Sequence, residues 1–137
     1  MKTIKDSKAC LLSIVIPCFN EGEIIEDVLN ETTQKLNQKL DQTDYQIVIV
    51  DDGSHDGTWE TVSTLANKNN QIVATKNLVN GGMWNAIHKG FRLVNGTYVT
   101  FLPADGEFSI DETMRLLENA TDVDIVVSSR HTQDKKI

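Results

Sequence analysis

The sequence predicts an α/β fold, a three-layer sandwich in which helices cover both faces of a mostly parallel sheet. Short apolar runs rich in β-branched residues alternate along the chain with segments whose apolar residues recur every three or four positions. This alternation favours parallel pairing, because each helix then provides the crossover between two strands. With 137 residues and no internal repeat, residues 1–137 are expected to form a single domain.

Five strands are expected, each from a short apolar run. Strands that are apolar along their whole length are typical of parallel sheets buried on both faces. The first run ends at a proline, and the others are bounded by polar or glycine-containing segments. The runs are Leu11–Pro17, Gln46–Val50, Ile72–Thr75, Tyr98–Leu102 and Asp124–Ser128.

Four segments between or beside these runs have helical spacing. Their apolar residues would form one face of a helix and pack on the sheet. The last helix is expected to begin at Ser109, because Ser109 and Glu112 have the spacing of a capping box. The segments are Ile24–Leu40, the residues around Val62–Ala66, Met83–Val94 and the residues after Ser109.

The net charge of −7 argues against two classes of surface. Nucleic acids and anionic membranes both require basic patches, so neither is expected as a general partner. A phosphate-bearing ligand would then be held by a metal ion or by backbone N–H groups. Cys10 and Cys18 lack the spacing of metal ligands or of a disulfide framework, and we expect them to be buried as small apolar residues.

The N-terminus has a superficial likeness to a signal peptide. Three lysines precede the apolar segment Ala9–Phe19, but Asp6 lies among them and no small-residue cleavage site follows. A first buried strand is the favoured interpretation, and no stretch approaches the length of a transmembrane helix. We therefore expect a cytoplasmic protein.

Polar and glycine-rich segments follow the expected strands. In parallel sheets, ligands bind outside the carboxyl ends of the strands, so these segments are the candidate binding residues. They are Cys18–Glu21, Asp51–Thr58, Asn77–Gly82, Pro103–Phe108 and Ser129–Arg130. The chemistry is expected to gather at one edge of the sheet.

The segment VDDGSHDGT, residues 50–58, carries three carboxylates. No segment of the chain has the glycine pattern of a dinucleotide fold or of a P-loop. Four residues match positions of an EF-hand loop, namely Asp52, Ser54, Asp56 and Gly57, but its last position would be Ser63, which offers no bidentate carboxylate. A strand, not a helix, also precedes the loop, so an EF-hand is not favoured.

Turn formation explains only part of this acidic segment. Asp56, Gly57 and Thr58 are typical of a turn followed by a helix, and Asp56 is expected to cap that helix. The adjacent Asp51 and Asp52 are not explained in this way. We expect Asp52 to face the ligand cleft and to accept hydrogen bonds from a base N–H or a ribose hydroxyl.

Four motifs in order resemble the nucleotide-binding half of inverting family-2 glycosyltransferases, which have the Rossmann-like GT-A fold. The similarity is greatest to the dolichyl- or polyprenyl-phosphate sugar transferases, and it covers roughly residues 11–130. The motifs are PCFNEGE (17–23), VDDGSHDGT (50–58), NGGMWNAIHKG (80–90) and FLPADGEF (101–108).

The resemblance implies roles for individual residues. Pro17, Phe19 and Glu21 would line the base and ribose site, and Val50 and Asp52 would contact the nucleoside. Beside the donor, the resemblance places Asn80, Gly82, Ala86, Gly90 and Ala104. Arg130 would neutralise charge near the diphosphate. Gly81 and Gly82 would bring backbone N–H groups at a helix start close to an anion, although a plain tight turn is the alternative.

The fourth motif departs from the D-x-D pattern of the family. Pro103 stands in place of the first aspartate, Asp105 keeps the second position, and Glu107 stands where many relatives have glutamine. The resemblance implies Mg²⁺ or Mn²⁺ held by Asp105 and Glu107 with the substrate phosphates. The alternative is an acidic loop that caps the helix from Ser109.

The implied reaction is inverting transfer of a sugar from a UDP- or GDP-sugar to a polyprenyl phosphate or a glycan. Asp105 and Arg130 are the expected catalytic residues, and His55 and His88 are expected to be exposed rather than to act as bases. In the family the acceptor is bound by residues after the G-S-R segment, so the acceptor-binding part is expected to be absent here.

The class of protein stays open between three alternatives. A non-catalytic nucleotide-binding or interaction module derived from a glycosyltransferase is the main alternative to an enzyme. A nucleotidyltransferase is less favoured, because its basic glycine-rich loop is missing. The resemblance also allows peripheral association with the inner face of the membrane, and it leaves the oligomeric state open.

Overall fold

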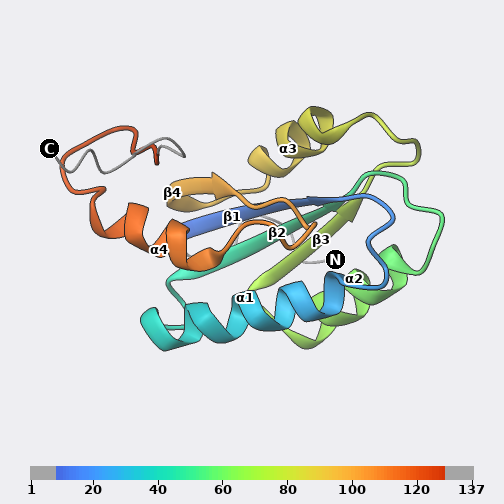
Figure 1. Cartoon of the computed structure of the whole chain (residues 1–137), viewed down its shortest axis with the longest axis horizontal. Helices are drawn as coiled ribbons and strands as arrows, with labels where there is room; N and C mark the ends of the chain where they lie inside the picture. Colours follow the sequence, from blue (N-terminus) through green and yellow to red (C-terminus); the bar gives the residue numbers. More distant parts are fainter. Residues whose placement is uncertain (1–8, 129–137) are drawn as a thin grey trace, which may run out of the picture.

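The computed structural model describes residues 9–128, in which strands and helices alternate strictly (Figure 1). The elements are β1 (Cys10–Cys18), α1 (Ile25–Lys39), β2 (Tyr45–Asp51), α2 (Thr58–Lys68), β3 (Ile72–Lys76), α3 (Met83–Phe91), β4 (Gly96–Phe101) and α4 (Ile110–Glu118). The first four expected strands and all four expected helices are therefore present, with ends shifted by a few residues.

The strands form one parallel sheet in the order β3-β2-β1-β4. In the register of the sheet, Ile14 of β1 pairs with Ile47 of β2 on one side and with Thr100 of β4 on the other. Helices α1, α2 and α4 cover one face, and α3 lies on the opposite face (Figure 1). The predicted three-layer α/β sandwich is confirmed.

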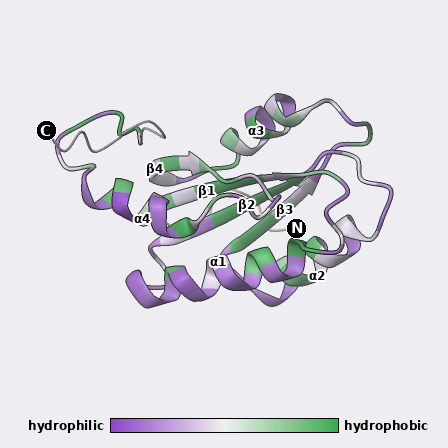
Figure 2. Ribbon diagram, in the orientation of Figure 1, coloured by the Kyte–Doolittle hydropathy of each residue, from purple (hydrophilic) through white to green (hydrophobic). Residues whose placement is uncertain are grey.

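The core has two halves because alternate residues of a strand point to opposite faces. Ile14 and Ile47 are fully buried against the layer of α1, α2 and α4, whereas Val15 and Val48 are fully buried beneath α3. Figure 2 shows the central strands as the most apolar elements and the outward sides of the helices as polar. This pattern explains why β1 and β2 read as continuous apolar runs.

Gly90 sets the distance between α3 and the sheet. A Cβ atom at this position would lie 2.3 Å from Cγ1 of Val15 in β1, far inside van der Waals contact. The absence of a side chain therefore lets α3 pack closely on the sheet. This packing fixes the start of α3, at Met83, over the carboxyl ends of the strands.

The fifth expected strand, Asp124–Ser128, is not formed, and this prediction is wrong. Ile125 and Val127 are each 80% exposed, and residues 123–126 line a cavity with β4 and α4 rather than pairing with a strand. An apolar run becomes a strand only where a neighbouring backbone accepts its hydrogen bonds. Asp122, at φ +59°, turns the chain just before the run, which does not align with the outer edge of β4.

No helix within residues 9–128 is both long enough and apolar enough to cross a bilayer.

Candidate active site

The loops that follow β1, β2, β3 and β4 meet at one edge of the sheet because all four strands run in the same direction. Figure 1 shows the loops after β1, β2 and β3 gathered beyond the arrowheads. This is the edge at which parallel sheets bind ligands. It contains most of the residues that the sequence proposes for a site.

Asn20 joins the first loop to the second. Its backbone N–H donates to Oγ of Ser54 at 2.8 Å, and its side-chain Oδ1 accepts from the N–H of His55 at 2.9 Å. To make both bonds Asn20 takes φ +51°, a left-handed conformation that asparagine tolerates better than most residues. The loop after β1 is therefore held directly on the loop after β2.

Asp56 makes the second connection between these loops. Its Oδ2 accepts from the N–H of Gly22 at 3.0 Å, and its Oδ1 accepts from the N–H of Thr58 at 2.9 Å and from the Thr58 hydroxyl. The Thr58 hydroxyl in turn accepts from the N–H of Glu21 at 3.0 Å. These donors, the Thr58 hydroxyl first, lower the pKa of Asp56. The sequence predicts that Asp56 caps α2, but the N-cap is Gly57. Asp56 lies one residue earlier, where its carboxylate binds Thr58, the first residue of the helix, and also fixes the loop after β1.

Asp51 stabilises the turn in which it lies. Its carboxylate is buried at the end of β2, and Oδ1 accepts from both the N–H and the hydroxyl of Ser54. A buried carboxylate requires such donors, since leaving it unpaired is costly. Asp51 therefore shapes the loop that carries Ser54 to Asn20.

Asp52 connects the second loop to the third. Its carboxylate is 3% exposed and accepts from Nδ2 of Asn77 at 2.8 Å, from the N–H of Gly81 at 3.0 Å and from the N–H of Gly82 at 2.8 Å. Nζ of Lys89 donates a hydrogen bond of 3.0 Å to Oδ1 of Asn77, the oxygen of the same side-chain amide. Asn77, Gly81, Gly82 and Lys89 thus form one network around a single buried carboxylate.

This network changes the interpretation of the glycine pair. The sequence suggests that the N–H groups of Gly81 and Gly82 are offered to a bound anion, but in the structure the carboxylate of Asp52 accepts from both. Gly82 has φ +90°, which glycine adopts readily. The anion at the start of α3 is therefore one that the protein itself provides.

The loop after β4 brings Asp105 close to the loop after β1. Burial, and after it the negative charges of Asp105 and Asp56, raise the pKa of Glu21. Asp105 and Glu107 are both exposed, and Oδ1 of Asp105 accepts from the N–H of Glu107 at 3.0 Å. Within residues 9–128 no three histidine, cysteine or acidic side chains lie close enough together to form a metal site by themselves.

The remaining sequence-predicted residues differ in the exposure of their side chains, and therefore in whether a ligand could contact them. Phe19 is 40% exposed at the edge, whereas the side chains of Pro17, Val50 and Ala104 are buried. Arg130 lies outside the described residues. His55 and His88 are exposed, as expected.

Two residues that organise this edge, Asn20 and Asn77, lie in segments that the sequence proposes for binding, but the sequence assigns neither a role of its own. Each directly follows or lies near a strand end, and asparagine in such a position is a typical turn residue. Their position near a strand end was the signal in the sequence that they shape the loops. Their partners, however, lie in other loops, so only the fold reveals what each one holds.

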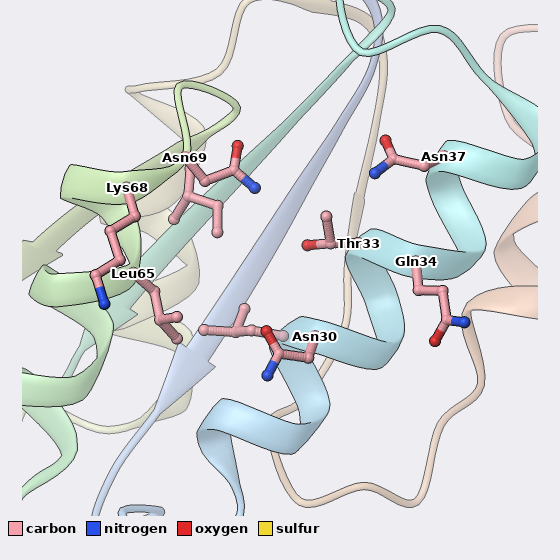
Figure 3. Close-up of a pocket in the computed structure, with 9 residues that line it drawn as sticks. Asn30, Thr33, Gln34, Asn37, Leu65, Lys68 and Asn69 are labelled. Atoms are coloured by element: carbon pink, nitrogen blue, oxygen red, sulfur yellow. The ribbon is translucent and has the colours of Figure 1, made fainter.

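A groove lies away from this edge, between α1 and α2. It has a volume of about 480 Å³ and is lined largely by polar side chains, among them Asn30, Gln34, Lys68 and Asn69 (Figure 3). None of the sequence-predicted site residues borders it. The groove therefore provides a region of the surface where no donor contact is expected.

Comparisons with known proteins agree with the motifs. The model of the family described as glycosyl transferase family 2 matches residues 13–137. A dolichyl-phosphate beta-glucosyltransferase of Trichomonas vaginalis is 34% identical over 142 residues, which cover 97% of this chain and 44% of the relative. The chain thus spans less than half the length of this relative.

Two solved structures have the same fold. The Staphylococcus aureus protein TarS, residues 1–349, in complex with UDP-GlcNAc has a TM-score of 0.63 at 23% identity and covers 80% of this chain and 31% of its own. A mannosyltransferase of Pyrobaculum calidifontis in complex with GDP-Man and Mn²⁺ has a TM-score of 0.63 at 22% identity and covers 73% of this chain and 30% of its own. At such identities the likeness is one of fold.

Proposed function

The chain belongs to glycosyl transferase family 2, with the GT-A fold, and on that premise we propose that it forms the donor site for a nucleotide-diphosphate sugar. The transfer reaction of the whole protein is part of this proposal. The observation that carries it is the edge of the sheet at which hydrogen bonds to Asp52 and Asp56 hold three loops together. Such preorganisation lowers the entropic cost of binding.

The base and the ribose would bind between the loops after β1 and β2. Phe19 presents an exposed aromatic ring there, which can pack against a planar base or a sugar. Glu21 would accept hydrogen bonds from ribose hydroxyls. Pro17 and Val50, which are buried, would support the floor of the site, and Asp52 would shape it through Gly82.

The diphosphate would lie beside the loop after β4, near Ala104. Asp105 and Glu107 offer carboxylate oxygens, the ligand type that Mg²⁺ and Mn²⁺ prefer, and both side chains are exposed to an incoming ion. Since a cation in nucleotide sites is often held by one or two carboxylates together with substrate phosphates, this pair fits the group. When bound, the ion would neutralise the leaving diphosphate, and Arg130 would add a positive charge.

The acceptor class proposed is a polyprenyl phosphate, with a glycan as the alternative. The support is the similarity to a dolichyl-phosphate beta-glucosyltransferase. A phosphate acceptor is already anionic at neutral pH and needs little help from a general base. His55 and His88 are exposed, and neither is proposed as a general base, which agrees with such an acceptor. The proposed location is the cytoplasm, at the inner face of the membrane.

Calorimetric titration with UDP and GDP, each with and without Mn²⁺, tests the proposal. We expect micromolar affinity for one of the two nucleotides, increased by Mn²⁺, and loss of that increase in Asp105→Ala. Asp41→Ala, an exposed acid before β2, is the matched control and should bind as the unaltered chain does. No binding of either nucleotide under any condition would contradict the donor site and favour a non-catalytic module.

A further inference from the structure

Acidic residues are unevenly distributed along the chain. Although the net charge is −7, there is no aspartate or glutamate between Glu60 and Asp105. This stretch contains α3 and the loop before it, and its large apolar side chains are unusually exposed. The exposed fractions are 91% for Leu78, 77% for Val79, 48% for Met83 and 66% for Trp84.

One of these apolar side chains, Trp84, lies beside positive charge, and the loop that carries Leu78 and Val79 reaches the same groove at Asn77. The loop of residues 77–82 runs directly into α3, the only helix of the described residues on its face of the sheet (Figure 1). Trp84, Lys89 and Arg92 line one groove of about 430 Å³ on the outer side of α3. We call Leu78, Val79, Met83 and Trp84, with Lys89 and Arg92, the α3 patch.

The charge around the α3 patch distinguishes it from a second exposed apolar segment, near the end of the described residues. Ile125 and Val127 are as exposed as Val79, but Asp122 and Asp124 flank them. In the α3 patch an aliphatic loop and a tryptophan are joined to cations, and the one carboxylate described as binding this loop, that of Asp52, is buried. Aliphatic side chains that enter the headgroup region, tryptophan at the interface and cations facing lipid phosphates are the features of interfacial membrane binding.

We propose that the α3 patch docks the chain on an anionic phospholipid bilayer, with Leu78 and Val79 entering the headgroup region. The exposed Arg92 complements the charge of the lipids, and Lys89, whose ammonium also binds the carbonyl of Lys76 and the amide of Asn77, adds positive charge to the same groove. The rest of the chain is acidic and stays away from the membrane. The net charge therefore describes most of the surface, but not this face.

Docking at the α3 patch would place the donor site at the membrane. The loop of residues 77–82 follows β3 at the carboxyl edge of the sheet, and Asp52 of the candidate site binds its Gly82. A polyprenyl phosphate would present its phosphate at the same interface. This role of docking in sugar transfer rests on the proposed function. Docking itself requires no nucleotide, so an experiment can contradict the docking proposal without contradicting the donor site, and the reverse.

Flotation with vesicles tests the docking. The chain is mixed, without nucleotide, with vesicles of phosphatidylcholine alone or of phosphatidylcholine with phosphatidylglycerol. We expect binding to the anionic vesicles that weakens with salt, and a loss of about tenfold or more in Leu78→Ser/Val79→Ser, from the burial of two aliphatic side chains. The double variant Ile125→Ser/Val127→Ser, with equally exposed side chains, should bind as the unaltered chain does.

The contribution of charge is tested by a second pair of variants. Arg92→Glu should lower binding to anionic vesicles about tenfold, because it replaces an attraction with a repulsion. Lys68→Glu, on the opposite face at the groove between α1 and α2, should leave binding unchanged.

Three results would overturn the proposal. The first is no binding to either kind of vesicle, and the second is an equal loss in the two serine double variants. The third is that the unaltered chain self-associates and does not bind vesicles, and that Leu78→Ser/Val79→Ser abolishes this self-association. That result would assign the patch to a second copy of the chain. Nucleotide titration of the same variant shows separately whether the donor site is intact.

Discussion

The carboxylate of Asp52, at the end of β2, accepts a hydrogen bond of 2.8 Å from the backbone N–H of Gly82, just before α3. The same carboxylate accepts from Gly81 and Asn77, so one buried side chain fixes the whole loop between β3 and α3. Gly82 is held at φ +90° by this contact and by the start of the helix. The geometry of the third loop therefore depends on a residue of the second.

Replacing Asp52 with asparagine should destabilise the chain and weaken nucleotide binding. The amide nitrogen cannot accept from an N–H, so at least one donor of the loop is left without its partner in a buried position. Losing a hydrogen bond to a charged group costs about 2–3 kcal/mol. Urea unfolding measures this change, and calorimetry measures the accompanying loss of affinity.

Asp41→Asn is the control for Asp52→Asn, since Asp41 is exposed and distant from the loops. It should change the free energy of unfolding by less than about 0.5 kcal/mol. If Asp52→Asn were as stable as this control, Asp52 would not organise the third loop.

The contribution of Asp56 to the free energy of unfolding should depend on pH. Because donors from Thr58 and Gly22 lower its pKa in the folded chain, the ionised form stabilises the fold above the unfolded pKa, and this stability is lost as the pH falls through the folded pKa. The difference in unfolding free energy between the unaltered chain and Asp56→Asn should thus shrink as the pH falls below about 4, the ordinary pKa of an aspartate. A difference that stays constant over this range of pH would show that the carboxylate charge is not involved.

Gly90→Ala should destabilise the chain even though alanine favours helices. A gain of about 1 kcal/mol is expected from helix propensity alone. The added Cβ, however, would lie 2.3 Å from Cγ1 of Val15 and would force α3 away from β1, and such overpacking costs about 1–3 kcal/mol. Thermal unfolding compares this variant with Gly57→Ala, where the added atom meets nothing within 4 Å. Gly90→Ala should have the lower midpoint, and the reverse order would refute close packing of α3.

Cys18 should not react with thiol reagents in the folded chain. Burial, followed by the negative charge of Asp51, raises the pKa of its thiol to about 12, so almost no thiolate forms near neutral pH. Cys10 is buried as well. Titration with a chromogenic disulfide should detect both thiols after unfolding and neither one before. Rapid modification of Cys18 in the folded chain would mean that the end of β1 opens readily.

The fold class followed from the sequence because β1 and β2 are buried on both faces and contain almost no polar interruption. The fifth strand was predicted by the same argument and failed, since apolar composition at Ile125 and Val127 cannot specify a hydrogen-bonding neighbour. The β4 strand shows an intermediate case. Its residues alternate between exposed and half-buried positions, as expected where only one face is well covered.

The edge of the sheet at which the candidate residues gather could be predicted, whereas the contacts that these residues make could not. Parallel strands place Glu21, Asp52 and Asp105 at one edge whatever their side chains do. The partners of Asp52 depend on the path of a loop 25 or more residues further along the chain, and no local pattern encodes that path. The sequence therefore indicated an open anion site at Gly81 and Gly82, where the structure shows an internal carboxylate.

The proposed donor site requires a nucleotide to bind where the four loops meet. Nitrogen-15 amide spectra, recorded with and without the nucleotide and Mn²⁺, test it most directly. We predict that the signals of residues 19–24, 52–58, 77–82 and 102–108 shift together on titration, while those of Asn30, Gln34 and Asn69 at the groove between α1 and α2 do not. Shifts confined to that groove, with the four loops unaffected, would contradict the donor site proposed at the edge of the sheet.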